Sequence, residues 1–173
     1  QYIESLGMLD LHVIAAHCVH ITEEEMDLVK NRRFYPIYNP SSNLKLASGF
    51  TPVQKMLDKG IVMGIGTDGD SSNNNQNILE EIHIGSIVNK AVNMDPKALP
   101  AMEILKMATI NGAKALGLED QVGSIEEGKA ADLTIFNLNS ASFTPKNNLI
   151  SALCYSAQAE DVKHVLIGGE FVL

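Results

Sequence analysis

The stretch Ile61–Asn75, which reads IVMGIGTDGDSSNNN, decides the fold of this chain. Residues 61–66 are all apolar or glycine, a pattern that predicts a strand buried on both faces, as in a parallel sheet. Polar residues begin at Thr67 and Asp68, at the carboxyl end of this strand, where α/β folds place their reactive groups. We therefore expect Asp68 on the rim of a sheet, followed by a flexible polar loop. A plain Asp-Gly turn is the alternative interpretation of the same residues.

The residues before this stretch alternate between strand and helix patterns. Apolar runs predict strands at residues 9–16, 34–38 and 61–66, and capping signals predict helices from Thr22 to about Arg32 and from Thr51 to Gly60. The first of these helices begins with a capping box, in which Glu25 follows Thr22 at the third helical position. Residues 39–49 are expected to form a long loop, and loops of that length are often functional. This alternation predicts parallel strands joined by right-handed crossovers.

The sequence changes in character after residue 118. Two helical patterns come before that point, at 77–93 and 101–116, with a bend expected at Asn111-Gly112 in the second. Short strands and turns follow it: a strand at 133–136, a short helix at 149–156, and a hairpin at 165–173 that turns at Gly168-Gly169. We therefore expect two units, residues 1–118 and residues 119–173.

The composition is that of a globular protein and excludes several functions. The chain has 173 residues, of which 45% are hydrophobic and 20% charged, and a net charge of −8, so it amounts to about one ordinary domain. It has no basic run, which argues against nucleic-acid binding, and no apolar stretch long enough to span a membrane. Two cysteines do not form a disulfide framework, so a cytoplasmic location is expected.

Polar side chains follow three of the predicted strands. They are His17 and His20 after the first strand, Asn39, Ser41 and Asn43 after the second, and Asp68, Ser71 and Ser72 after the third. Because parallel strands end at the same edge of a sheet, we expect His17 and Asp68 to lie close together. Such a pair can bind a divalent metal, polarise a water molecule or act as an acid–base pair. A Ser-His-Asp triad with Ser71 or Ser72 stays open, although no nucleophile-elbow motif is present. His12, inside the first strand, is expected to be structural.

Several of these segments resemble the amidohydrolase superfamily. They are AHCVH at 16–20, NPSSNLKLASG at 39–49, and GTDG at 66–69 followed by SNN at 72–74. Within the superfamily the chain is similar to the TRZ/ATZ group, above all to the 5-methylthioadenosine/S-adenosylhomocysteine deaminases. The segments MATINGA at 107–113 and GSIEEGKAADL at 123–133 are also typical of that group. The resemblance extends over essentially the whole chain.

The resemblance implies an α/β fold, the C-terminal part of a TIM-like (β/α)8 metal-dependent hydrolase barrel with part of a small β-sandwich. Residues 1–118 correspond to strands six to eight of the barrel and the helices that follow, and residues 119–173 to part of the sandwich. The implied activity is hydrolysis of a C–N bond other than a peptide bond, by deamination of an adenosine-type, nucleoside-like small molecule. The implied cofactor is a divalent metal, zinc in the first place, with iron or manganese as alternatives.

The resemblance also assigns roles to individual residues. Asp68 matches the aspartate that binds the metal and takes a proton from the attacking water. His17 matches a histidine that positions and polarises that water. Ser72 falls where a serine contacts the substrate, and three further residues are expected to shape the pocket: His20, Asn43 and Asn73.

Two motifs of the family are absent from this chain. One is the His-x-His that follows strand one, and the other is the His-x-x-Glu that follows strand five and supplies a metal ligand and the general acid. We expect the chain, with helix-like residues 1–7 at one end and an apolar run up to Leu173 at the other, to be a fragment. Alone it should bind metal poorly and be inactive. Its open strand edges should favour a homo-oligomer or pairing with a missing N-terminal half.

Two departures from the family pattern leave the substrate open. Tyr38 stands where many relatives have His or Cys, and Asp70 stands where relatives often have Ala. The alternatives are another amidohydrolase substrate, such as guanine, a chlorotriazine or another nitrogen heterocycle. A non-catalytic α/β domain that binds a ligand or oligomerises is the alternative from another class.

Overall fold

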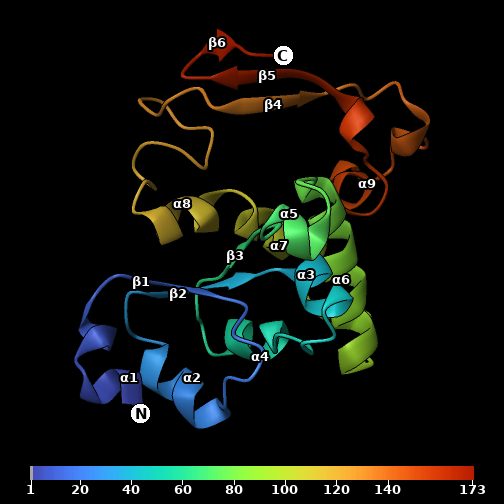
Figure 1. Ribbon diagram of the computed structural model, residues 1–173. Coiled ribbons are helices and arrows are strands. Elements are labelled where there is room, and N and C mark those ends of the chain that lie inside the picture. The colour runs from blue at the N-terminus through green and yellow to red at the C-terminus, as the bar shows by residue number, and fades with distance from the viewer. Residues whose placement is uncertain (1) are drawn as a thin grey trace.

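The structure is a computed structural model that describes residues 2–173 (Figure 1). Its first sheet is parallel and has the order β1-β2-β3, with β1 at Val13–Ala16, β2 at Phe34–Tyr38 and β3 at Gly64–Ile65. The predicted strand at 34–38 is confirmed at both ends. The strand predicted at 9–16 is shorter, because Met8–Asp10 forms a 3-10 turn, η1. Only two residues of the stretch 61–66 pair with β2, although Ile61 and Met63 are buried as expected.

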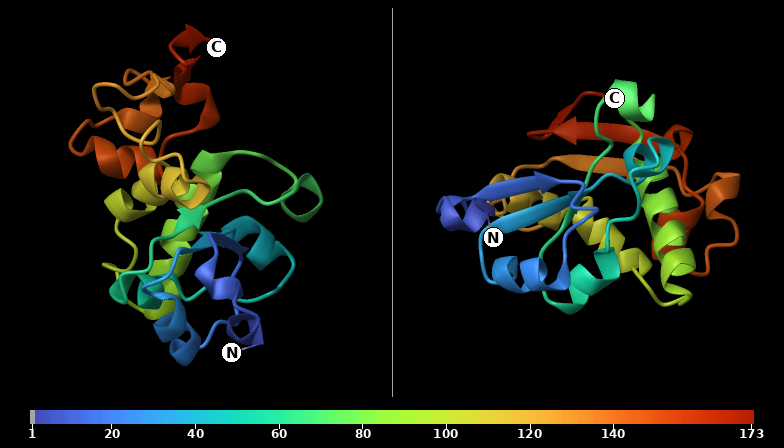
Figure 2. Two further views of the ribbon diagram at one scale, coloured as in Figure 1. Left: turned by 90° about the vertical axis from the view of Figure 1, so that its left-hand side faces the viewer. Right: turned by 60° about the horizontal axis from the view of Figure 1, so that its bottom comes forward.

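Helices connect these strands and cover the sheet. The first crossover contains α2 (Glu23–Val29), which ends before the expected Arg32, and the second contains α4 (Val53–Asp58). Figures 1 and 2 show α2 and α4 on the same side of the parallel sheet. The long helix α6 (Ile78–Asn93) follows β3 and agrees with the predicted 77–93. At the other end of the chain, the short α1 (Tyr2–Ser5) precedes Gly7, which has φ 71°; Gln1 of the expected helical segment lies outside the described residues.

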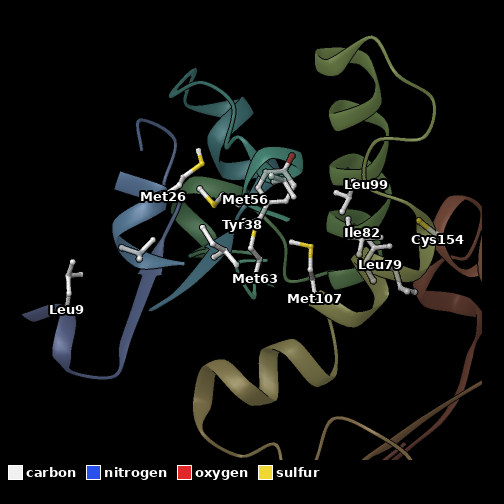
Figure 3. Packing of buried hydrophobic residues seen from close by; sticks show 14 residues of the cluster. Leu9, Met26, Tyr38, Met56, Met63, Leu79, Ile82, Leu99, Met107 and Cys154 are labelled. Carbon is white, nitrogen blue, oxygen red and sulfur yellow. The ribbon is translucent and has the colours of Figure 1, made fainter. Parts of the chain in front are cut away.

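The main hydrophobic core lies between the parallel sheet and its helices (Figure 3). Four methionines from different segments are at most 1% exposed: Met26 on α2, Met56 on α4, Met63 before β3, and Met107. Each such side chain contributes roughly 1.5–3 kcal/mol relative to an exposed position. Tyr38, at the end of β2, is 3% exposed and belongs to the same cluster. The core therefore fixes the ends of β2 and β3, where the polar residues follow.

Three predictions about loops and bends were wrong. Residues 40–45 of the expected loop form α3 (Pro40–Lys45), because Pro40 occupies the first helical turn, where its missing N–H costs nothing. The loop after Asp68 contains α5 (Asp70–Asn73). The pattern at 101–116 is two helices, α7 (Ala101–Met107) and α8 (Ile110–Leu116), which separate before the expected bend. At that junction Thr109 Oγ1 donates to the Leu105 carbonyl at 2.7 Å, a side-chain bond that competes with helix continuation.

The later residues form a second, antiparallel sheet with the order β4-β5-β6. Its strands are Leu133–Phe136, Val162–Ile167 and Glu170–Phe171. Gly168 and Gly169 have φ of 58° and 86°, which suit the tight hairpin turn predicted for them. The short helix α9 (Leu149–Tyr155) packs on α6 and α7, and the 3-10 turns η2 (Ala141–Phe143) and η3 (Ala159–Asp161) flank it. In Figures 1 and 2 this sheet lies beyond α7 and α8, away from the parallel sheet.

The predicted capping box gives a first test of the fold. Thr22 Oγ1 accepts from Glu25 N at 3.2 Å, and Glu25 Oε2 accepts from Thr22 N at 2.9 Å. Thr22→Ala should therefore lower the free energy of unfolding by about 1 kcal/mol, measured by urea denaturation followed by circular dichroism. Thr22→Ser keeps the hydroxyl and serves as the control. Equal stability of the two variants would show that the cap contributes nothing.

Candidate active site

The candidate site lies at the carboxyl edge of the parallel sheet. His17 follows β1 directly, Asn39 follows β2 directly, and Asp68 is the third residue after β3. The ladder continues just past the strands, since His17 N donates to the Ile37 carbonyl and Gly66 N donates to the Tyr38 carbonyl, both at 2.9 Å. The three chain segments therefore leave the sheet side by side, as parallel strands require.

The backbone bends sharply where the two titratable residues stand. His17 has φ 68° and Asp68 has φ 60°, in the left-handed region that non-glycine residues seldom adopt. Thr51 Oγ1 donates to the His17 carbonyl at 2.6 Å and holds the first bend in place. Such strain is found mainly where surrounding contacts enforce it, and it is concentrated at functional sites. Here it turns both side chains toward each other.

A chain of hydrogen bonds sets the tautomer of the His17 ring. The Thr51 hydroxyl proton goes to the His17 carbonyl, so Thr51 Oγ1 accepts from Asn43 Nδ2 at 3.1 Å. That bond fixes the Asn43 amide, whose Oδ1 lies 2.8 Å from His17 Nδ1. An amide oxygen only accepts, so His17 Nδ1 carries a proton and donates it. In the neutral ring, Nε2 is then the atom with the free lone pair.

Asp68 lies opposite that nitrogen. Its Oδ2 is 3.7 Å from His17 Nε2 and accepts from Ser42 Oγ at 2.6 Å and from Ser72 Oγ at 2.9 Å. The Ser42 hydrogen bond, with those of the Gly69 backbone and Ser72, lowers the pKa of the Asp68 carboxyl, and the nearby His17 adds to this. The carboxylate is therefore ionised at neutral pH. About a third of each side chain is exposed, 32% for Asp68 and 39% for His17, so a small molecule can reach both.

A sequence comparison now places the chain in a family. The sequence profile of the Amidohydrolase family matches residues 1–172. The chain belongs to the amidohydrolase family. The 5-methylthioadenosine/S-adenosylhomocysteine deaminase of Thermoanaerobacter pseudethanolicus is 51% identical over 173 residues, which are all of this chain and 40% of that protein. The chain thus spans less than half the length of this relative.

Solved structures share the fold of this amidohydrolase chain. An adenosine deaminase from Xanthomonas campestris with bound zinc superposes with a TM-score of 0.97 at 39% identity, covering 99% of this chain and 39% of that one. The atrazine chlorohydrolase TrzN from Arthrobacter aurescens, complexed with zinc, superposes with a TM-score of 0.93 at 26% identity, covering 99% and 38%. Both comparisons support the amidohydrolase fold. This fold belongs to the α/β class that the sequence predicts.

The structure places the other predicted site residues at different depths. Ser72 touches Asp68 directly, whereas Asn43 is only 2% exposed and reaches His17 from beneath. Asn73 is 8% exposed, and its Nδ2 donates to the Thr67 carbonyl at 2.7 Å and to Glu81 Oε1 at 2.8 Å. His20 lies exposed on the turn after β1.

The Ser-His-Asp triad is not formed. The hydroxyl of Ser72 bonds to Asp68 and to the Gly69 carbonyl, and Ser71 is exposed on α5. Among residues 2–173 the His17 ring bonds to Asn43, and the other side chains recorded beside its nitrogens are those of Asn39 and Asp68, not of a serine. A serine nucleophile needs a hydrogen bond to the histidine, so this amidohydrolase chain does not carry that machinery.

The two departures from the family pattern take different positions. Tyr38 points into the core, where its hydroxyl accepts from Asn89 Nδ2 at 3.2 Å, and burial raises its pKa. Tyr38 therefore does not face Asp68. Asp70 is exposed, and its Oδ1 accepts from Gln76 Nε2 at 2.7 Å.

Sequence reasoning missed three residues of the site. The local pattern predicts a loop at Ser42 and a helix cap at Thr51, and it assigns no role to Glu81. Glu81 is 0% exposed, and its position between the apolar Ile78, Leu79 and Ile82 of a helical pattern was the available signal. Conversely, His12 is structural as expected, since its ring contacts the Ala115 carbonyl at 2.7 Å and stacks on Tyr35.

The donor set for a metal is partial. Among residues 2–173 no three His, Cys, Asp or Glu side chains gather closely enough to hold a metal ion. Asp68 offers one carboxylate, with an imidazole beside it, at the edge where this fold class puts its chemistry. A catalytic zinc takes three protein ligands. These residues fit one corner of such a site.

Over residues 2–173, no helix is long and apolar enough to cross a membrane.

Proposed function

We propose that this chain is the C-terminal part of a zinc-dependent amidohydrolase that deaminates an adenosine-type nucleoside such as 5-methylthioadenosine or S-adenosylhomocysteine. The observation that carries the proposal is the pair of Asp68 and His17, held 3.7 Å apart by hydroxyls and amides at the carboxyl edge of a parallel sheet. Support for the substrate class comes from the 51% identity to a relative of that name over the whole chain. The relative is longer, so the activity is proposed for a full-length protein of similar size.

The same proposal covers the architecture. Residues 1–118 would form strands six to eight of a (β/α)8 barrel with the helices that follow, and residues 119–173 part of a β-sandwich. Within residues 2–173, β1 pairs only with β2, so its other edge is open. Beside it runs an apolar groove of about 650 Å³, lined among others by Met8, Ile14 and Phe34. An open edge flanked by apolar residues favours a further parallel strand from the rest of the full-length protein over a free surface.

The metal would be held by Asp68 together with ligands outside this chain. Zinc is favoured over iron or manganese because two structurally similar amidohydrolases contain it. When bound, the metal supplies the Lewis acidity that makes water a nucleophile at neutral pH. Asp68 is suited to take the proton of that water, because hydrogen bonds from Ser42 and Ser72 keep it ionised. His17 Nε2 is suited to accept a hydrogen bond from the same water and to orient it.

The overall reaction exchanges the amino group of the purine for the oxygen of water. Water loses a proton to Asp68, and its oxygen bonds to the ring carbon that carries the amino group. The bond between that carbon and the amino nitrogen breaks. The proton held by Asp68 is available to the departing nitrogen, which leaves as ammonia. His20 and Ser72 contact the substrate. Asn43 and Asn73 are buried and support the site from the protein interior.

A panel of substrates tests the substrate class. The zinc-loaded full-length protein is given 5-methylthioadenosine, S-adenosylhomocysteine, guanine and a chlorotriazine, and ammonia or chloride release is followed. The proposal requires the highest kcat/KM for one of the adenosine-type compounds. A preference for guanine or for the chlorotriazine would move the protein to another amidohydrolase substrate class. Zinc-loaded protein that processes none of them would favour a non-catalytic role.

The isolated 173-residue chain should be inactive. It contributes a single carboxylate ligand, so we expect it to lose zinc during dialysis against a weak chelator and to release no ammonia from 5-methylthioadenosine. The full-length protein treated in parallel should keep about one zinc per chain, because it supplies the three or so ligands that a catalytic site needs. Stoichiometric zinc and deamination by the isolated chain would overturn this division of the site.

A further inference from the structure

A buried carboxylate joins the two segments that carry the site. Glu81, on the first turns of α6, is 0% exposed. Its Oε2 accepts from the Ser41 backbone N–H at 3.0 Å, and its Oε1 accepts from Asn73 Nδ2 at 2.8 Å. Ser41 lies in the segment after β2, and Asn73 lies in the segment after β3. The short helix α3 contacts both α5 and α6 in this region (Figure 1).

The neighbours of these two contacts are the residues that hold Asp68 and His17. Ser42, next to Ser41, donates to Asp68 Oδ2, and Asn43 fixes the His17 ring. Ser72, next to Asn73, donates to the same Asp68 oxygen. Asn73 also donates to the Thr67 carbonyl, one residue before Asp68. Each end of Glu81 is thus one residue away from a direct contact of the reactive carboxylate.

The rest of α6 supports the same edge of the sheet. Gly85 and Asn89 follow Glu81 at intervals of four residues and so lie on one helix face. A Cβ on Gly85 would lie 2.9 Å from Tyr38 Cε1, so glycine is what lets the helix approach the end of β2. Asn89 Nδ2 donates to the Tyr38 hydroxyl. The helix is therefore in close contact with Tyr38, the residue immediately before Asn39. This contact limits how far Glu81 can shift.

We propose that Glu81 is a positioning residue: by accepting from Ser41 and Asn73 at once, it sets the spacing between the two segments and so aligns Ser42, Ser72 and Asp68. The effect of Glu81 on turnover rests on the proposed function. Its effect on the spacing of the two segments does not. A buried carboxylate without its partners would be strongly destabilising, so the folded chain requires both hydrogen bonds of Glu81. The role assigned here is to hold Asp68 in one orientation relative to His17.

Glu81→Gln is the direct test. The amide keeps the shape of the side chain but has one oxygen, so its NH2 must face a donor, either Ser41 N–H or Asn73 Nδ2. We expect kcat of the zinc-loaded full-length protein to fall about 10- to 100-fold, as when a supporting hydrogen bond of a reactive ligand is lost. KM should stay unchanged, because Glu81 touches no substrate. Glu103→Gln, which removes a carboxylate from the surface pair with Lys106, is the matched control and should keep wild-type kcat.

Two further measurements separate positioning from simple loss of stability. Asn73→Ala and the double variant Glu81→Gln/Asn73→Ala should show coupled effects, with the double variant no slower than the slower single one. If Glu81 served stability alone, the melting temperature would drop while kcat per folded, zinc-loaded molecule stayed at the wild-type value, and the proposal would be rejected.

Hydrogen exchange makes the test independent of the reaction. The Ser41 amide should exchange faster in Glu81→Ala, which removes both acceptor oxygens, than in the wild-type full-length protein, whatever substrate the enzyme uses. A wild-type protein that deaminates nothing would refute the proposed function and leave this readout intact. Unchanged exchange at Ser41 would refute the proposal that Glu81 holds the Ser41 segment in place.

Discussion

Asp68→Asn should abolish most of the activity of the full-length protein, with kcat/KM for 5-methylthioadenosine about 10³- to 10⁴-fold lower. The amide cannot take a proton from water and is a poor metal ligand. An NH2 group in the place of Oδ2 would also face Ser42 and Ser72 together, whose hydroxyls now both donate to that oxygen. The measurement is steady-state ammonia release together with the zinc content of each preparation.

A neighbouring carboxylate provides the control for Asp68. Asp70 lies two residues further along the same loop, is exposed, and accepts from Gln76. Asp70→Asn removes the same charge from nearly the same place without touching Oδ2 of Asp68, and it should leave kcat within a few-fold of the wild type, since exposed charges contribute little. Equal losses of kcat in both variants would mean that the negative charge of the loop matters. The carboxylate of Asp68 would then have no specific role.

His17→Ala should lower kcat by about 10²-fold, the lower end of what a positioned proton-transfer group contributes. The ring presents Nε2 toward Asp68 because Asn43 Oδ1 accepts from Nδ1 on the other side. Removing the ring takes away the group that we propose orients the water, while Asp68 and its two serine contacts remain. Zinc content should therefore stay near the wild-type value, and the loss should appear in turnover.

The control for His17 is a histidine far from the site. His164 lies on β5, where its ring packs edge-on against Phe171. His164→Ala should keep wild-type kcat. If His17→Ala lost its zinc in proportion to its activity, the water-orienting role would be wrong and His17 would act as a metal ligand.

The sequence alone predicted the parts of the fold that follow from local pattern. The apolar run at 34–38 became β2 without change, and the Gly168-Gly169 hairpin formed as expected. The parallel arrangement then predicted the proximity of His17 and Asp68, which the 3.7 Å distance confirms. These predictions succeeded because each depends on residues adjacent in the chain, or on the rule that parallel strands end at one edge.

The errors have a common physical origin in contacts between distant residues. Thr51 was interpreted as a helix cap, but its hydroxyl serves the His17 carbonyl 34 residues away. Glu81 is 40 residues from Ser41, and its buried position follows from the packing of α6 on α3. Local pattern carries no information on such partners, since a Thr before Pro and a Glu in a helix are ordinary where they stand. The loop at 39–49 was misjudged for a local reason, the helix-starting role of Pro40.

One measurement tests the central claim most directly. The zinc-loaded full-length protein is incubated with a known amount of 5-methylthioadenosine until the reaction stops, and ammonia and the nucleoside product are both counted. We predict one ammonia per substrate consumed and a product in which oxygen replaces the amino group, with only a trace of release from Asp68→Asn over the same time. Unchanged nucleoside in the presence of bound zinc, or equal release by Asp68→Asn, would contradict this prediction.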